Sequence, residues 1–310
     1  MSPLHFVLPV FLVIGAGYLL RRFGIFTEEG DRSLLAVLVK LFLPCLALDV
    51  IVGNEALSRP SNWLGPPVAG FVVAALGYGV CYAAGRLVFR DSGKVRTFSA
   101  VAGLQNYSYI PLPLCQGMFD REVVGVLFVF NLGVDIAMWT IGVGILSGGK
   151  SGNRWLSSLL NPPLVAVIAA LALNYIGINK FTPNAMGQAV HMLGLCAVPV
   201  GLILTGAVLA DHIKPGLLRS GWEVISLGVV LRLLVLPAGI LAGAVWLPLD
   251  PALKKVLVIQ SAMPAAVFPI VLAKLHGGDM PVALRVVLGT SLPALATIPL
   301  WIDWALRLIR

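Results

Sequence analysis

The stretch QNYSYIPLP, residues 105–113, places amides, hydroxyl groups and two prolines inside a long apolar run of the sequence. Pro111 and Pro113 have no backbone N–H, and each ring clashes with the carbonyl group four residues earlier, so a regular helix cannot continue through them. The freed backbone groups and the neighbouring polar side chains can therefore bind a ligand. The polar side chains that precede the prolines include those of Asn106, Tyr107 and Ser108.

A matching stretch, MPAAVFP, occurs late in the chain and contains Pro264 and Pro269. The polar residues Gln260 and Ser261 precede it, and Val267 lies between its prolines. If the two interrupted helices lie side by side, four half-helix ends meet at one place. Positive N-terminal ends suit an anion, whereas carbonyl ends suit a cation.

Apolar runs make up most of the chain, which is 58% hydrophobic and only 12% charged. Soluble domains carry about 25% charged residues, and an apolar run of roughly 18 residues or more is typical of a membrane-spanning helix. The sequence therefore predicts an all-α polytopic membrane protein with ten transmembrane helices. The expected segments are 4–20, 33–52, 64–89, 97–118, 122–147, 157–178, 185–210, 221–247, 254–275 and 281–306.

Both proline-interrupted stretches fall near the middle of the bilayer. Asn106 follows Arg96 by ten residues, or about 15 Å of helix, and Pro264 follows Lys255 by nine residues, or about 14 Å. The hydrocarbon core is about 30 Å thick. Irregular backbone at that depth is tolerated only where it is buried in protein or lines a water-filled cavity. We expect substrate contacts from Asn106, Tyr107, Ser108, Pro111, Pro113, Gln260, Ser261, Pro264, Val267 and Pro269.

Two charged residues also lie deep in predicted helices. Arg232 lies about 17 Å into its span and Asp135 about 20 Å into another, with Asn131 one helical turn away. Charges at this depth are rare and are functional candidates by default. Asp135 is a candidate for proton coupling, for a structural pair or for a water-lined cavity. Arg232 is a candidate for a structural lock with a carboxylate or for a role in substrate binding or coupling.

The polar loop GGKSGNRW divides the ten predicted segments into five and five. An odd number of spans in each half requires the halves to be inverted, and inverted repeats with interrupted helices in corresponding positions are typical of transporters. We expect a first five-helix repeat at 1–147, a short cytoplasmic linker at 148–156 and an inverted second repeat at 157–310, all in one membrane unit.

The net charge of +8 is better explained by membrane topology than by nucleic-acid binding. With both termini outside, inner loops hold twelve Lys and Arg residues against seven on the outer side, which agrees with the positive-inside rule. HExxH, GxSxG and catalytic carboxylate pairs are absent from the sequence, so we do not expect an enzyme. The four cysteines have no metal-ligand spacing, and no cofactor or metal is expected.

Several stretches together resemble the auxin efflux carrier family, which spans plant PIN-type carriers and bacterial organic-acid permeases. The resemblance covers nearly the whole chain. It rests on IQSAMPAAVFPIVLAK with Gln260, Pro264, Pro269 and Lys274, on Asn106 and Pro113, on LRLLVLP at 231–237, and on NPPLVAVIAALALNYIGI and VPVGLILTGAVLA.

The resemblance implies two inverted five-helix repeats with broken, crossed helices 4 and 9. It also implies an elevator-type secondary transporter of small organic anions, often homodimeric, in the plasma membrane, which in bacteria is the inner membrane. The sequence departs from the plant carriers in lacking a long central loop. It departs from bacterial relatives at Asp135, where they tend to have an amide or an apolar residue, and Pro111 is an additional proline.

Other functions stay open at this point. A sodium-coupled symporter of the bile-acid type shares the expected fold and would need oxygen ligands around the breaks. A channel or a sensor is a further alternative. The coupling ion is expected to be H⁺ or Na⁺, and the expected partners are the substrate and the lipid bilayer.

Overall fold

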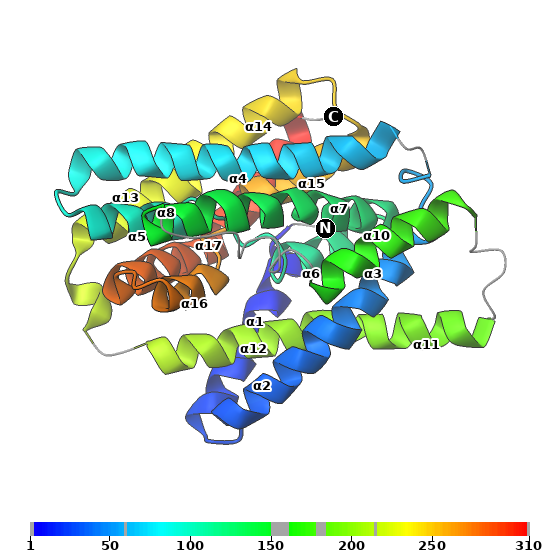
Figure 1. Cartoon of the computed structure of the whole chain (residues 1–310), viewed down its shortest axis with the longest axis horizontal. Helices are drawn as coiled ribbons and strands as arrows, with labels where there is room; N and C mark the ends of the chain where they lie inside the picture. The colour runs from blue at the N-terminus through cyan, green and yellow to red at the C-terminus, as the bar shows by residue number, and fades with distance from the viewer. Residues whose placement is uncertain (1–2, 59–60, 150–160, 178–183, 214–215, 309–310) are drawn as a thin grey trace.

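The computed structural model describes residues 3–58, 61–149, 161–177, 184–213 and 216–308. Every regular element within these ranges is a helix, and seven helices or helical runs are long and apolar enough to cross a membrane. The chain is therefore an all-helical membrane protein (Figure 1).

Three of the seven runs lie in the first part of the chain and include one internal π-helical turn. They are α1 (Leu4–Arg22), the run α2 (Glu28–Val37), π-helical turn (Leu38–Phe42) and α3 (Leu43–Ile51), and α4 (Ser61–Val88). The other four are α7 (Arg121–Ala137) with a π-helical turn (Met138–Gly142) and α8 (Val143–Ser147), α11 (Asn184–Leu195) with α12 (Ala197–His212), α13 (Trp222–Val230) with a π-helical turn (Leu231–Val235) and α14 (Leu236–Trp246), and α17 (Met280–Leu308).

Shorter helices lie between these runs. Two pairs are separated by the stretches that carry the paired prolines: α5 (Ser92–Ala102) precedes α6 (Pro111–Met118), and α15 (Pro251–Ser261) precedes α16 (Phe268–Leu275). Pro111 and Pro269 stand in the first two positions of their helices, where a missing N–H breaks no intrahelical bond. The remaining short helices are α10 (Pro162–Tyr175) and a 3₁₀ turn (Leu217–Arg219).

Two of the π-helical turns have a cause in the sequence. Pro44 and Pro237 each lie two residues after the end of such a turn, and neither proline can donate a hydrogen bond to the carbonyl four residues earlier. For Pro237 that carbonyl belongs to Leu233, and it accepts a hydrogen bond from Trp301 Nε1 at 2.7 Å. The side chain on α17 thus satisfies a backbone group that the proline leaves free.

The helices pack in two groups. In the first group, α1 packs along α12, and α3 packs against α10 and α11. In the second group, α4 packs along α7 and α5, α13 along α17, and α14 along α15. Helices α2, α11 and α12 lie at the opposite side of the molecule from α4 (Figure 1).

Glycines allow the closest contacts inside each group. Gly17 on α1 faces the backbone of Ile203, and Gly206 on α12 faces the backbone of Ile14. The contact between α4 and α7 repeats this arrangement, with Gly70 against Phe130 and Gly133 against Pro67. Small residues at such positions let membrane helices approach closely enough for extensive van der Waals contact.

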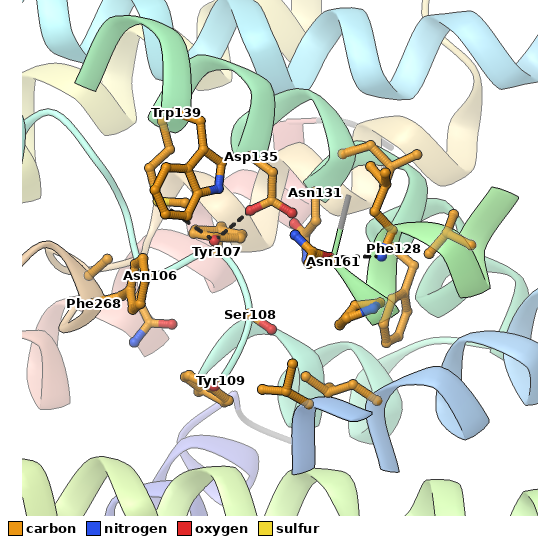
Figure 2. Close-up of a pocket in the computed structure, with 18 of the residues that line it drawn as sticks. Asn106, Tyr107, Ser108, Tyr109, Phe128, Asn131, Asp135, Trp139, Asn161 and Phe268 are labelled. Carbon is orange, nitrogen blue, oxygen red and sulfur yellow. Dashed lines mark hydrogen bonds between the residues drawn. The ribbon is translucent and has the colours of Figure 1, made fainter. Parts of the chain in front are cut away.

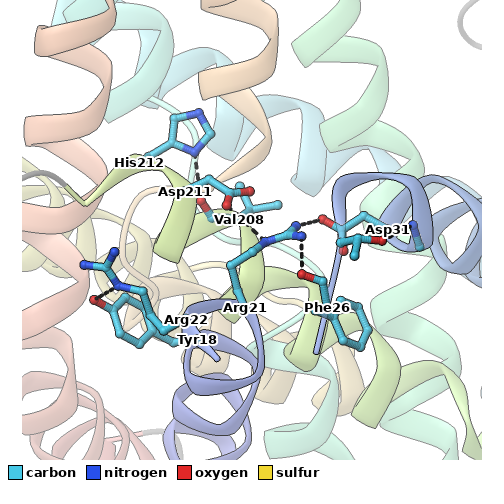
Figure 3. Close-up of polar contacts among 10 residues, drawn as sticks. Tyr18, Arg21, Arg22, Phe26, Asp31, Val208, Asp211 and His212 are labelled. Atoms are coloured by element: carbon cyan, nitrogen blue, oxygen red, sulfur yellow. Dashed lines mark hydrogen bonds and ion pairs between the residues drawn. The ribbon is translucent and has the colours of Figure 1, made fainter. Parts of the chain in front are cut away.

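Ion pairs close the end of the first group at which α1 stops. Arg21 pairs with Asp31 on α2, donates to the Phe26 carbonyl at 2.8 Å and lies 3.0 Å from Asp211 on α12 (Figure 3). One guanidinium therefore joins three helices of this group.

Of the expected linker at 148–156, positions 150–156 lie outside the described residues, as do positions 157–160 and 178 of the expected sixth segment.

Candidate functional site

The two proline-containing breaks contact each other through their backbones. The Asn106 N–H donates to the Pro264 carbonyl at 2.7 Å, and the Ala266 N–H donates to the Leu104 carbonyl at 3.0 Å. The side chain of Gln260 adds a hydrogen bond to the Tyr107 carbonyl at 3.0 Å. Backbone groups that no helix can satisfy at this depth are therefore satisfied by the opposite break.

A cavity of about 290 Å³ lies beside this contact (Figure 2). This volume is at the lower end of the range for small-molecule sites, which is about 300–1,000 Å³. Aromatic and aliphatic side chains form much of the wall. The polar lining residues are Asn106, Tyr107, Ser108, Tyr109, Asn131, Asp135 and Asn161.

Two half-helices begin at the cavity. Lining residues 106–109 lead into α6, and lining residues 266–268 lead into α16. Within the described ranges, no acceptor bonds the N–H groups of Ser108, Tyr109 or Val267. The N-terminal end of a helix carries a partial positive charge and unbonded donors, so this side of the cavity suits an anion.

The facing wall of the cavity carries a carboxylate. The Tyr107 hydroxyl donates to Asp135 Oδ1 at 2.7 Å, so the side chain of Tyr107 reaches from the break to α7 (Figure 2). Asn131 Oδ1 is buried and has no hydrogen-bond partner among the described residues. No lysine or arginine belongs to the described lining. The cavity thus combines positive helix ends with an acidic side chain that has no basic partner among the described residues.

Arg232 lies outside the cavity lining, although it is one of the expected site residues. Its side chain is buried, and Nη1 donates to the Gly103 carbonyl at 3.3 Å. No described carboxylate forms an ion pair with Arg232. The expected structural lock with a carboxylate is therefore not observed among the described residues, and the guanidinium instead contacts the end of a helix.

The other expected residues divide between lining and support. Asn106, Tyr107, Ser108, Val267, Asn131 and Asp135 line the cavity. Those that lie beside it at the ends of the half-helices are Pro111, Pro113, Gln260, Ser261, Pro264 and Pro269. Ser261 donates to the Val258 carbonyl at 2.7 Å, and the Pro264 carbonyl joins the two breaks, so these two residues hold backbone in place.

Several lining residues were not predicted from the sequence. On α7 and its π-helical turn, Phe128, Asn131, Asp135 and Trp139 all line the cavity. They are three or four positions apart, the spacing of one helix face. That spacing around Asp135 was a signal that could have identified Phe128 and Trp139. Asn161 also lines the cavity and caps α10 by accepting from the Leu164 N–H at 2.9 Å.

Comparison with known proteins identifies the family. The family model described as membrane transport protein matches residues 4–154 and 150–302. An uncharacterized transporter of Methanocaldococcus jannaschii is 26% identical over 99% of both chains. A second uncharacterized transporter, from Methanothermobacter thermautotrophicus, is 25% identical over 95% of this chain and 96% of its own length. The resemblance to the auxin efflux carriers is thereby confirmed: the chain is a membrane transporter, not an enzyme, and it belongs to the membrane transport protein family that includes those carriers.

Proposed function

We propose that this protein is a secondary active transporter that moves a small organic carboxylate across the membrane by elevator-type alternating access. The observation that carries the proposal is the cavity onto which α6 and α16 both direct their N-terminal ends. Two helix ends with unbonded N–H groups offer a carboxylate charge-assisted hydrogen bonds where water is scarce.

The proposal includes ten membrane segments in two inverted repeats, with α5–α6 and α15–α16 as broken, crossing segments. The contacts between helices support it, because contacts made by one half have counterparts in the other half. The contact between α1 and α12 corresponds to the contact between α10 and α3. The contact between α4 and α7 corresponds to the contact between α13 and α17. The two matched stretches, 4–154 and 150–302, agree with repeats at 1–147 and 157–310.

The position of the cavity supports alternating access. Its lining comes from both groups of helices: Val39, Leu43 and Val167 belong to the first, whereas Asn106 and Asp135 belong to the second. Sliding of the second group along the first would carry the breaks and the bound substrate from one face of the membrane toward the other. The first group would then act as the static scaffold.

Asp135 is the proposed coupling residue. An ionised carboxylate beside a carboxylate substrate is repulsive, and the repulsion is strong where the effective dielectric constant is low. A proton on Asp135 would neutralise the side chain and remove this repulsion. Substrate and proton would therefore bind together. Asn131 and Tyr107 would orient the acid, since Tyr107 already donates to it.

Sodium coupling is the second candidate. Asp135 and Asn131 both present side-chain oxygens to the cavity, and no basic side chain belongs to its described lining. Oxygen ligands of this kind suit a hard cation. The proton is favoured here because it leaves the positive helix ends free for the substrate.

We also propose the plasma membrane as the location, with both termini outside, and a homodimer as the assembly. The proposed orientation rests on the excess of basic residues in the loops that it places inside. An impermeant thiol reagent should then label a cysteine placed at position 2 or 308 from outside, in a variant without native cysteines, but not one at position 152.

Counterflow from proteoliposomes tests the proposed function. Vesicles loaded with one unlabelled carboxylate from a panel would be diluted into the same labelled compound, with and without pH and Na⁺ gradients. We expect saturable counterflow of at least one monocarboxylate or dicarboxylate, and net accumulation driven by a pH gradient. Failure of the whole panel would reject the substrate class, and a steady non-saturable flux would indicate a channel. Accumulation driven only by Na⁺ would favour the second candidate.

A further inference from the structure

Arg232 is the one charged residue that is buried among the described residues, with 1% of its surface exposed. Two of its nitrogens, Nε and Nη2, have no described partner, and the third donates to the Gly103 carbonyl at 3.3 Å. An uncompensated charge in the membrane interior is strongly unfavourable. Its surroundings must therefore supply negative charge of another kind.

The carbonyl end of α5 supplies that negative charge. Gly103 caps α5, and the chain then turns away into the break, so the last carbonyls of this half-helix lose their helical donors. Within the described ranges, no N–H group bonds the carbonyls of Ala100, Val101 or Ala102. A helix C-terminus carries about half a negative charge, and a cation beside it is stabilising.

Close packing against α4 leaves little space around the Gly103 carbonyl at the end of α5. The Gly103 carbonyl lies against Gly77 on α4, where any side chain would collide with it. Gly103 itself lies against Tyr78, which is also buried. The guanidinium of Arg232 therefore closes a helix end that has tight contacts with the neighbouring helix.

The corresponding end of α15 is closed differently. Ser261 donates to the Val258 carbonyl at 2.7 Å, and the Ala262 N–H donates to the Ile259 carbonyl at 3.2 Å. No basic side chain donates to this helix end among the described residues. One interrupted helix thus closes its carbonyl end with its own residues, whereas the other uses a cation from a different helix.

The backbone around Arg232 is itself held in place. Arg232 lies in the π-helical turn that precedes Pro237, and Trp301 holds the Leu233 carbonyl in the same turn. The position of the guanidinium is therefore coupled to α17 as well as to α5. A side chain fixed in this way can orient the half-helix that leads to Asn106.

We propose that Arg232 is a tethered cation that occupies the carbonyl end of α5 and holds the break in place. It is a positioning residue that acts on substrate binding through the half-helix. The inference rests on the proposed transport function and deepens it, because it assigns the positive charge at this helix end to the chain itself. Removal of the side chain should then create a site for a small external cation at this helix end.

The test uses Arg232→Ala, Arg232→Gln and Arg232→Lys in the full-length protein. Arg285→Ala is the matched control, because Arg285 also donates to a backbone carbonyl, that of Leu217 at 3.2 Å, but away from the break. Thermal unfolding in detergent and counterflow per folded protein would be measured in choline chloride, then with added Na⁺, guanidinium or urea. Urea resembles guanidinium in shape but carries no charge.

Arg232→Gln and Arg232→Ala should lose at least about tenfold in rate, which corresponds to about 1.4 kcal/mol. Arg232→Lys should retain more activity than Arg232→Gln, because the charge is kept. Guanidinium, and not urea, should raise both the melting temperature and the rate of Arg232→Ala, whereas Arg285→Ala should respond to neither.

Two results would overturn the inference: an Arg232→Gln variant with the native rate, or an Arg232→Ala variant that guanidinium does not stabilise. If the neutral variants fail to fold, Arg232→Lys decides the matter: a rate and melting temperature close to native support a role of the charge at the α5 end, and loss of both overturns it. The thermal measurements need no substrate. They therefore stand if every carboxylate fails in counterflow, which would reject the proposed function alone.

Discussion

At the scale of single residues, the pair Tyr107–Asp135 connects the break to α7. Tyr107 also contributes its carbonyl to Gln260, so one residue contacts both the acid and the second interrupted helix. A change in the protonation of Asp135 would alter the hydrogen bond that it accepts. The break and the proposed coupling site are therefore in direct contact.

The coupling role predicts a separation of two activities. Asp135→Asn keeps the side-chain shape but cannot release a proton, so accumulation driven by a pH gradient should be lost while exchange of bound substrate is retained. Both are measured with the same proteoliposomes. Tyr109→Phe is a suitable control, because Tyr109 lines the cavity and its hydroxyl has no hydrogen bond within the described residues. Full pH-driven uptake by Asp135→Asn would exclude Asp135 from coupling.

The sequence predicted part of this site because some residues are informative by type alone. An acid deep in an apolar segment and an amide beside two prolines stand out, so Asp135 and Asn106 were identified. Phe128 and Trp139 were missed because aromatic residues are common in membrane helices and become lining residues only through the face they share with Asp135. The partner of Arg232 could not be predicted either, since a backbone carbonyl leaves no mark in the sequence.

At the scale of elements, prolines and glycines decide where the helices deviate and how closely they pack. Pro111, Pro113, Pro264 and Pro269 predicted both breaks, because the loss of an N–H acts locally. The contact between Gln105 and Ala265 in the two breaks could not be predicted. It depends on how segments distant in sequence meet in space.

Trp301 should stabilise the protein through the carbonyl that Pro237 frees. Trp301→Phe leaves the Leu233 carbonyl without its donor, and an unsatisfied buried group costs about 1–3 kcal/mol. The melting temperature in detergent should fall. Trp304→Phe is the control, because Trp304 is half exposed and packs edge-on against Trp301. Equal melting temperatures for the two variants would mean that the hydrogen bond contributes little.

Gly17 provides a second test at this scale. A methyl group at Gly17 collides with the backbone of Ile203, whereas one at Gly15 on the same helix meets no atom within 4 Å. Gly17→Ala should therefore destabilise the contact between α1 and α12 by about 1–3 kcal/mol, the usual range for overpacking. Gly15→Ala should be neutral or slightly stabilising in a thermal unfolding assay. If Gly17→Ala melts at the native temperature, the two helices can separate without penalty.

At the scale of the whole molecule, the elevator proposal divides the ion pairs into two kinds. Asp49 on α3 lies 3.0 Å from His191 on α11, within the first group, and 3.4 Å from Arg121 on α7, in the second group. The pair with His191 can persist through the transport cycle. The pair with Arg121 must break if the groups slide past each other.

Cross-linking distinguishes these two pairs. In a variant without native cysteines, Asp49→Cys with Arg121→Cys, joined by a short bismaleimide, should stop counterflow because the link ties the two groups together. Asp49→Cys with His191→Cys should keep its activity after the same treatment, since both positions belong to one group. Unchanged transport by a fully cross-linked first pair would contradict relative movement of the groups.

If a carboxylate binds in the cavity at the break, Asn106→Ala should bind the substrate more weakly than the native protein does. A hydrogen bond to a charged group contributes about 1.5–3 kcal/mol. Loss of the amide should therefore raise the substrate concentration at half-maximal counterflow by roughly ten- to a hundredfold. The variant should still fold, because its backbone bond to Pro264 does not involve the side chain, and the contact that the side chain accepts from the Ile110 N–H is long, at 3.4 Å. Asn62→Ala, which removes a contact to the Ala56 carbonyl outside the cavity, should keep the native affinity. Native affinity and rate in Asn106→Ala would contradict the claim.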